Sequence, residues 1–487
     1  MSDFRFVVIA LWLHVGYCTG SEFRFGSYYA SHMVLQQQPS RAVLWGYGVV
    51  GATVNVNVWA GDGNYSQQTT AVNEEQKIAE AVDKIILEDV FFGDVWLCSG
   101  QSNMEMTVLQ IINASEELSL ASHYPYIRLF QAGWKMSDHE LDDLAGIAVQ
   151  WSAPTAEILG RGNFTSFSAV CWLFGRYLYD KLRYPIGLVE SCWGGTPIEV
   201  WSSKRALSKC NLPVNVSFVN EARGPHEPSV LWNAMIHPLK RMAIKGAIWY
   251  QGEANAALHN AEYNCTFPAM IEDWRKTFYQ GSEGSTKIDF SFGFVQLSTY
   301  HHKFPDDSFP WIRWHQTADF GFAPNPKMKR TFMAVAMDLG DEKSPYGSIH
   351  PRYKQEVAYR LYLGALAIAY EETEVVFQGP FPKHFQQKNT ELSITYSQEL
   401  AVLELSKDIF EVRCCLKWYN SNCTWVSAPM VNSSVNVVIL SLEECQQKVS
   451  GVRYAWNEWP CKLKKCPLYS RTSKLPAPTF MTPKNDH

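Results

Sequence analysis

Apolar runs alternate with amphipathic stretches from about residue 93 to residue 370, and this alternation constrains the fold more than any other feature. Strands that alternate with helices along a chain form a parallel sheet with helices on both faces. The pattern predicts strands at residues 94–98, 185–192, 244–250, 290–297 and 331–337, and helices at 167–182 and 353–370, the first capped by Ser166 or Ser168. We therefore predict an α/β domain over residues 93–372.

β-rich segments flank this domain on both sides. Residues 22–92 and 373–480 contain short runs with alternating apolar residues, separated by Gly-rich turns. We predict an N-terminal β-domain at 22–92 and a C-terminal β-domain at 373–480. Six cysteines fall in the second one and predict disulfides, because their spacing does not match a zinc site: Cys414, Cys415, Cys423, Cys445, Cys461 and Cys466.

The first twenty residues indicate a secretory route. Residues 6–15 form an apolar run too short to span a bilayer, and small residues follow it, which is typical of a signal peptide at 1–20. No later apolar run is long enough for a transmembrane segment. We expect a secreted or lysosomal protein with N-glycans at sequons headed by Asn64, Asn113, Asn163, Asn215, Asn264, Asn422 and Asn432.

The charge distribution argues against a nucleic-acid partner. The formal net charge is −5, and the chain has no long basic run. Aromatic residues make up 14% of the chain, a content that suits stacking against sugar rings as well as a large aromatic core.

Polar or Gly-rich segments follow several of the predicted strands. They lie at residues 99–105, 193–198, 251–255 and 338–341, and His350 precedes the closing helix. Ligands of parallel α/β sheets bind beyond the carboxyl ends of the strands, so we expect these segments to form one site.

Ser102 is the candidate nucleophile of this site. Gly100 permits a sharp turn after the strand, which exposes the Ser102 hydroxyl to a base such as His350. Met104 stands where the nucleophile elbow of α/β-hydrolases has glycine, so the motif is a different one. The alternative is that Ser102 only caps a helix.

Three residues are candidates for the oxyanion hole. Gly194 and Gly195 let a backbone N–H approach a substrate, because no Cβ intrudes there. Gln251 carries a side-chain amide that can donate to the same oxygen. The alternatives are a plain turn and a structural amide.

The order Ser102, Gly194, Gln251 and His350 resembles the four blocks of the SGNH (GDSL-like) hydrolases, in the branch where Gln replaces the third-block Asn. More closely, the chain resembles the animal sialate O-acetylesterase family, from Phe23 to about Pro478. The strings that carry this likeness are residues 92–104, 191–199, 249–253, 314–321 and 348–352.

The resemblance implies an SGNH-type fold and a serine esterase. It implies that Ser102 attacks, that His350 is the base and then the acid, and that the N–H groups of Ser102 and of Gly194 or Gly195 form the oxyanion hole with Gln251. The implied reaction releases acetate from O-acetylated sialic acids, free or on glycoconjugates and at the 9-position, through an acetyl-enzyme. No metal or other cofactor is implied.

Several positions depart from the family pattern. Ala254 stands where relatives usually carry Ser, and Cys192 where Ser is common, which makes Cys192 our candidate for an unpaired thiol. Gly347 and Ser348 replace the Asp that many microbial relatives have just before the histidine. The candidate orienters of His350 are therefore a backbone carbonyl with Ser348 helping, which we favour, or one of the carboxylates Asp338, Asp341 and Glu253.

Other classes compete with the esterase. A glycosidase could use Glu253 and Asp338 as paired carboxylates, but this reading leaves Ser102 without a role. A catalytically weak sialoglycan-binding protein, or an acetylesterase for another sugar, also fits the aromatic content and the two β-domains.

Overall fold

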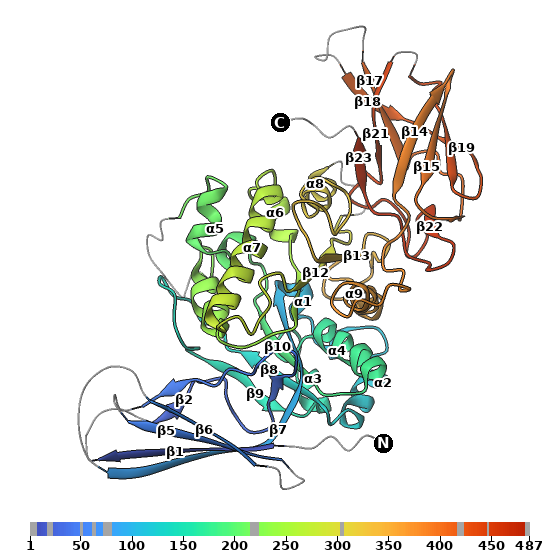
Figure 1. Ribbon diagram of the computed structural model, residues 1–487. Helices are drawn as coiled ribbons and strands as arrows, with labels where there is room; N and C mark the ends of the chain where they lie inside the picture. The colour runs from blue at the N-terminus through green and yellow to red at the C-terminus, as the bar shows by residue number, and fades with distance from the viewer. Residues whose placement is uncertain are drawn as a thin grey trace.

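A parallel sheet covered by helices forms the centre of the protein (Figure 1). The structure is a computed structural model that describes residues 7–16, 23–48, 52–60, 65–71, 80–214, 224–301, 306–415, 423–445 and 448–482. The strands of this sheet are β7 (Glu80–Gly100), β8 (Ile127–Ala132), β9 (Ile147–Ser152), β10 (Ile186–Cys192), β11 (Gly246–Tyr250), β12 (Ser291–Gln296) and β13 (Thr331–Val335). Their spatial order is β9-β8-β10-β7-β11-β12-β13, parallel except for β9 at the edge. The predicted α/β class is confirmed.

Helices cover both faces of the sheet because side chains alternate along each strand. Trp96 of β7 contacts Phe174 of α4 on one face, whereas Trp249 of β11 contacts Trp274 of α7 on the other. The helices are α1 (Ser102–Glu105), α2 (Ala114–Leu120), α3 (Ala156–Gly160), α4 (Ala169–Leu182), α5 (Lys204–Lys209), α6 (Glu253–Ala256), α7 (Tyr263–Gly281), α8 (Ser308–His315) and α9 (Lys354–Ile368). Ser168, one of the two predicted caps, accepts a bond from the backbone N–H of Cys171 at the start of α4.

The N-terminal strands share a strand with the central sheet. They are β1 (Val7–Gly16), β2 (Arg24–Phe25), β3 (Val34–Gln36), β4 (Gly46–Tyr47), β5 (Thr53–Ala60) and β6 (Tyr65–Ala71). The first half of β7 pairs antiparallel with β1, and its last residues pair in parallel with β10 and β11. The predicted domain boundary between residues 92 and 93 therefore lies inside one continuous strand.

The apolar run expected to belong to a signal peptide is strand β1 in the structure. Val7–Gly16 lies between β5 and β7 and pairs antiparallel with both. The rest of segment 1–20 lies outside the described residues, so the signal peptide stays a prediction.

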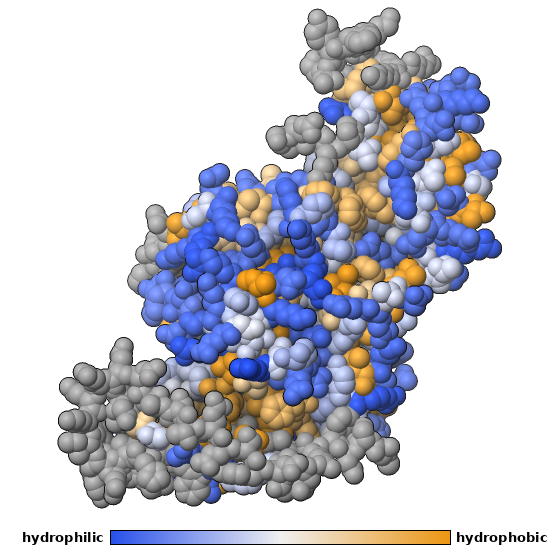
Figure 2. Space-filling model, in the orientation of Figure 1, coloured by the Kyte–Doolittle hydropathy of each residue, from blue (hydrophilic) through white to orange (hydrophobic). Residues whose placement is uncertain are grey.

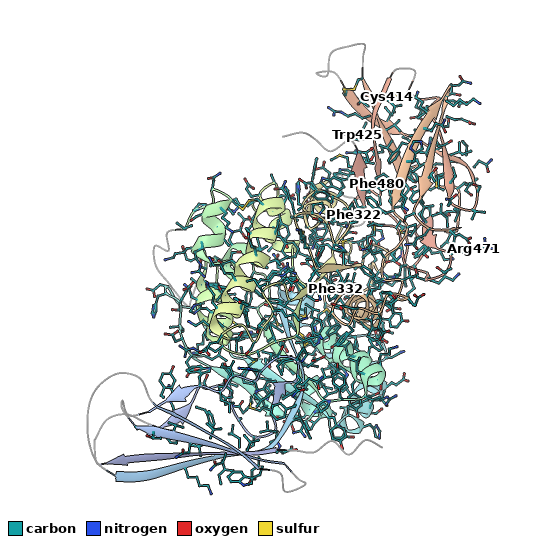
Figure 3. The ribbon with its side chains drawn as sticks, in the orientation of Figure 1. Phe322, Phe332, Cys414, Trp425, Arg471 and Phe480 are labelled. Atoms are coloured by element: carbon teal, nitrogen blue, oxygen red, sulfur yellow. A yellow bond between two sulfur atoms is a disulfide. The ribbon has the colours of Figure 1, made fainter. Side chains whose placement is uncertain are left out.

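The C-terminal region has two four-stranded antiparallel sheets packed face to face (Figure 1). One is β14-β15-β20-β19 and the other is β18-β17-β21-β23, and β16 pairs with β22. Phe480 of β23, labelled in Figure 3, packs against Phe410 and Tyr454 of its own sheet and against Phe385 of β14 in the other sheet. The bounds are β14 (Pro382–Lys388), β15 (Glu391–Tyr396), β16 (Leu400–Val402), β17 (Phe410–Cys415), β18 (Cys423–Ser427), β19 (Met430–Ser433), β20 (Val437–Ser441), β21 (Lys448–Tyr454), β22 (Leu468–Ser470) and β23 (Phe480–Thr482).

The six C-terminal cysteines form disulfides, as the sequence predicted, and four further cysteines pair as well. The C-terminal disulfides are Cys414–Cys445, Cys415–Cys423 and Cys461–Cys466, and the others are Cys98–Cys171 and Cys210–Cys265. Cys192, our candidate for an unpaired thiol, is the free cysteine of the described chain, and it is buried. Within the described ranges, no helix combines the length and apolar character that crossing a bilayer requires.

Candidate active site

Ser102 lies directly beyond the carboxyl end of β7, the middle strand of the parallel sheet. Gly100 ends that strand at φ +141°, and a Cβ there would lie 2.1 Å from the carbonyl oxygen of Tyr250. Only glycine fits this close approach, so the chain turns sharply and starts α1 at Ser102. Gln101 is the residue before the helix and forms no side-chain cap, so the structure gives Ser102 no capping role.

His350 reaches the Ser102 hydroxyl from the loop before α9. Its Nε2 lies 2.8 Å from Ser102 Oγ. Its backbone N–H binds the carbonyl of Gly347, and its carbonyl accepts the hydroxyl of Ser344 at 2.7 Å, so the loop holds the ring in place. Two residues 248 positions apart in sequence thus lie at the hydrogen-bond distance that a nucleophile and its base require.

The second ring nitrogen of His350 contacts a neutral group. Nδ1 lies 2.7 Å from the carbonyl oxygen of Tyr346, which accepts only, so Nδ1 carries the proton and Nε2 is free to accept one from Ser102. Burial lowers the pKa of His350; the bond to Tyr346 opposes this effect, and the charge of Lys354 adds to it.

The other candidate orienters have different partners. Ser348 donates to the carbonyl of Tyr300 at 2.6 Å rather than to His350. Asp338 is fully buried and accepts two bonds from Arg360 at 2.6 and 2.9 Å and one from Tyr469. Asp341 accepts from Arg352. The backbone carbonyl that we favoured is therefore the observed partner of His350. The contribution expected from Ser348 is not observed, because its hydroxyl binds the carbonyl of Tyr300 instead.

Gly194 and Gly195 lie beside the nucleophile. A Cβ at Gly194 would lie 2.7 Å from Glu105 Oε2 and 3.3 Å from the Cβ of Ser102, which places this residue against α1. Gly195 is exposed at φ +72°, with open space where a Cβ would stand. The strand end of β10 therefore brings a glycine pair to the front of Ser102.

Gln251 is buried behind this pair. Its Nε2 donates to the carbonyl of Thr196 at 3.1 Å and to Asn255 Oδ1 at 2.8 Å, and its Oε1 accepts from Tyr263. Both amide N–H groups thus have protein partners, and in this structure Gln251 braces the turn that carries Gly194 and Gly195. Its donation to an oxyanion stays a prediction.

Sequence reasoning assigned no role to Asn103, which joins the parts of the site. Its Nδ2 donates to Glu253 Oε1 at 2.6 Å and to the carbonyl of Ile349 at 2.8 Å, and its Oδ1 accepts from Lys354 Nζ at 2.6 Å. The residue beside the nucleophile thus binds the residue before His350. The only signal in the sequence was its place directly after Ser102.

Two aromatic contacts adjoin residues of the site. Phe164 packs its ring against that of His350, with centroids 5.2 Å apart. Trp193, the residue before Gly194, stacks on Trp134 at 5.5 Å, and Trp134 donates its indole N–H to the carbonyl of Cys192. Figure 2 shows a largely hydrophilic face over the helices of the central domain, interrupted by small apolar patches.

Comparison with known proteins places this site in a family. A human sialate O-acetylesterase is 49% identical over 501 residues, which cover 98% of this chain and 95% of the relative. This chain belongs to the sialate O-acetylesterase family. Family models agree: residues 92–282 match the model "carbohydrate esterase, sialic acid-specific acetylesterase", and residues 383–484 match the sialate O-acetylesterase C-terminal domain.

Further relatives extend the likeness to the fold. The mouse sialate O-acetylesterase is 48% identical, with 98% of this chain and 97% of the relative covered. A crystal structure of a carbohydrate acetylesterase from Xanthomonas citri superposes with a TM-score of 0.74 at 25% identity and covers 95% of this chain and 100% of its own. Among the described residues, no cluster of His, Cys, Asp and Glu could hold a metal ion.

Proposed function

We propose that this protein is a serine esterase that removes O-acetyl groups from sialic acids, with Ser102 as nucleophile and His350 as general base. The observation that supports the proposal most is the 2.8 Å contact between Ser102 Oγ and His350 Nε2, in a chain whose relatives at 49% identity are sialate O-acetylesterases. The 9-O-acetyl group is the substrate that we favour, because the resemblance to the animal sialate O-acetylesterases implies it.

In the first half of the reaction, His350 Nε2 takes the proton of Ser102 as Oγ attacks the acetyl carbon. The carbonyl oxygen becomes an oxyanion that receives the backbone N–H groups of Ser102 and of Gly194 or Gly195, with Gln251 as a third donor if its amide turns. The C–O bond to the sugar then breaks, and His350 returns its proton to the sugar oxygen. The acetyl group remains as an ester on Ser102.

In the second half, water replaces the sugar. His350 takes a proton from this water, whose oxygen attacks the acetyl-Ser102 carbon. The second tetrahedral intermediate then collapses as His350 returns the proton to Ser102 Oγ, and acetic acid leaves and ionises to acetate. Tyr346 holds the imidazole through a carbonyl, so the imidazolium gains dipole stabilisation but no ion pair.

Ser102→Ala tests the proposal directly. The variant should fold normally and lose at least ~10³-fold in kcat for acetate release from 9-O-acetylated sialic acid, because the nucleophile is gone. Ser348→Ala is the matched control, since its hydroxyl binds Tyr300 rather than His350. A folded Ser102→Ala variant with the activity of the control would contradict the proposal.

We also propose that the stacked pair Trp134 and Trp193 binds a sugar ring of the substrate glycan. Trp134 is 45% exposed, and Trp193 precedes Gly194 in sequence, so the platform adjoins the nucleophile. Sugar rings stack on such faces. Trp134→Ala should raise KM for a sialylated glycoconjugate but leave KM for a small acetyl ester unchanged, whereas equal effects on both would remove this role.

A secretory route supplies the oxidising conditions that the five disulfides need. We propose that the protein is secreted or lysosomal and carries glycans on exposed sequons. Asn432 and Asn163 are exposed, whereas Asn264 is half-buried and donates to Asp319 at 2.6 Å. Glycopeptide mapping should find glycans at the first two and none at Asn264; an unglycosylated protein from animal cells would overturn the route.

A further inference from the structure

Two carboxyl groups without a cation partner are buried behind the nucleophile. Glu105 ends α1, three residues after Ser102, and Glu190 lies on β10. Glu105 is 5% exposed and Glu190 is fully buried. No lysine, arginine or histidine of the described chain offsets the charge of either group.

The hydrogen bonds of Glu190 favour its ionised form. Its oxygens accept from the backbone N–H of Ser168 at 2.8 Å, from Gln131 Nε2 at 3.3 Å and from the thiol of Cys192 at 2.9 Å. All three partners are donors, so the carboxylate form keeps every bond. Burial raises the pKa of Glu190 to about 7, in spite of these bonds.

Glu105 has fewer hydrogen-bond donors around it than Glu190, and it lies next to Gly194. Its Oε2 lies against Gly194, and its Oε1 is buried without a partner. A Cβ at Gly194 would lie 2.7 Å from Glu105 Oε2 and 3.3 Å from the Cβ of Ser102, so this carboxyl lies beside the glycine pair, Gly194 and Gly195, from which one oxyanion donor is expected. Burial, then repulsion by Glu190, raise the pKa of Glu105 to about 8.

The pair therefore gives up its last proton only above neutral pH, and that proton resides on Glu105, whose pKa is the higher one. Two neighbouring carboxyls in a site without a cation do not both ionise. The titratable groups that face Glu105 are Glu190 and the thiol of Cys192, both on β10, and burial raises the pKa of that thiol so that it stays neutral. The donors from the neighbouring elements, Ser168 and Gln131, are uncharged and bind Glu190.

We propose that Glu105 is a positioning residue that keeps the oxyanion hole available only while it is protonated, so that its ionisation stops deacetylation in alkaline solution. A charged acceptor binds an N–H about twice as strongly as a neutral one. Ionised Glu105 therefore competes with the substrate for the N–H of Gly194 and places a negative charge beside Gly194 and Ser102. Loss of one oxyanion donor costs about 10²–10³ in kcat.

This inference rests on the proposed roles of Ser102 and His350, and pH profiles of kcat test it. Acetate release from an O-acetylated sialic acid is followed by NMR from pH 5 to 9.5, with the uncatalysed rate subtracted. The wild type should lose activity at high pH. Glu105→Gln should show a few-fold lower activity at pH 6.5 and no alkaline fall, because its amide cannot ionise.

The variant Glu190→Gln gives a second, independent test of the role of Glu105. Without repulsion from Glu190, Glu105 ionises more easily, so the alkaline fall should move to lower pH. Cys192→Ser is the matched control, because serine still donates to Glu190 and the fall should stay in place. If Glu105→Gln does not fold, the displacement in Glu190→Gln decides the question.

The outcomes separate the two proposals. An unchanged alkaline fall in folded Glu105→Gln, or an unmoved one in Glu190→Gln, overturns the role of Glu105 even if Ser102→Ala is inactive. Activity in Ser102→Ala overturns the esterase mechanism itself, whatever the pH profiles show.

Discussion

The strand ends of the central sheet carry two kinds of buried carboxyl group. Asp338 is joined to Arg360, and the paired oxygens and guanidinium nitrogens satisfy each other. Glu105 and Glu190 have only uncharged donors and each other. A buried carboxyl group thus has a guanidinium partner in one place and only uncharged donors in the other, and this difference in partners is what the predictions below test.

The first prediction removes the carboxylate charge from the buried ion pair of Asp338 and Arg360. Asp338→Asn leaves the charge of Arg360 buried without its counter-ion, so the free energy of unfolding should fall by about 3–5 kcal/mol. Asp341→Asn is the control: its partner Arg352 is 27% exposed, and the loss should be about 1 kcal/mol or less. Urea denaturation measures both, and equal losses would show that burial of the cation does not set the cost.

The second prediction concerns the carboxyl groups without a cation partner and the effect of their protonation on the free energy of unfolding. Glu105 and Glu190 have pKa values of about 8 and about 7 in the folded protein, above their values in the unfolded chain. The folded state therefore binds more protons between about pH 4.5 and 8, and this stability is present at pH 4.5 and lost as pH rises through 7 to 8.

The free energy of unfolding of the wild type, measured by urea denaturation, should accordingly decrease from pH 5 to pH 8.5 by on the order of a few kcal/mol. The double variant Glu105→Gln/Glu190→Gln should lose much less over the same range. The idea that these groups store the proton is wrong if the double variant retains the full decrease.

The third and smallest effect concerns a cation near the base. Burial lowers the pKa of His350 and the charge of Lys354 lowers it further, so kcat/KM should rise with pH through a pKa below the ordinary 6.5, as neutral His350 forms. Lys354→Met removes that charge and should move this acid limb to higher pH by a fraction of a unit.

Lys354→Met also removes the bond from Nζ to Asn103 Oδ1, so kcat should fall as well, by about 10- to 100-fold. Lys343→Met is the control, since Lys343 is exposed in the same segment of the chain. If the pKa of the acid limb is the same in Lys354→Met as in the wild type, the charge of Lys354 does not influence the pKa of His350.

Much of the fold followed from periodicity. The strand runs at 94–98 and 331–337 and the helix at 353–370 appear as the end of β7, β13 and α9, because long apolar runs and strong helical periods leave few alternatives. β8 and β9 were not predicted. β9 is a half-buried edge strand, and polar residues such as Gln150 interrupt the apolar signal.

The site was less predictable than the fold. Position along the chain singled out Ser102 and His350, since both follow strand ends. The carbonyl of Tyr346 and the bridging amide of Asn103 could not be chosen from sequence, because hydrogen bonds to backbone and to distant helices depend on loop geometry. Glu190 carried no signal, because a charged residue inside an apolar run is ordinarily read as an interruption.

The continuous course of β7 restricts how the molecule can be divided. This strand pairs with β1 in the N-terminal sheet and ends at Gly100, two residues before Ser102. A cut of the chain at residue 93 would therefore divide one continuous strand, so the α/β domain could not be joined at that point to a different N-terminal domain. A one-residue insertion in the N-terminal half of β7 would be transmitted along the same backbone, and would shift the nucleophile by about 3.3 Å or reverse its face unless a bulge absorbed it.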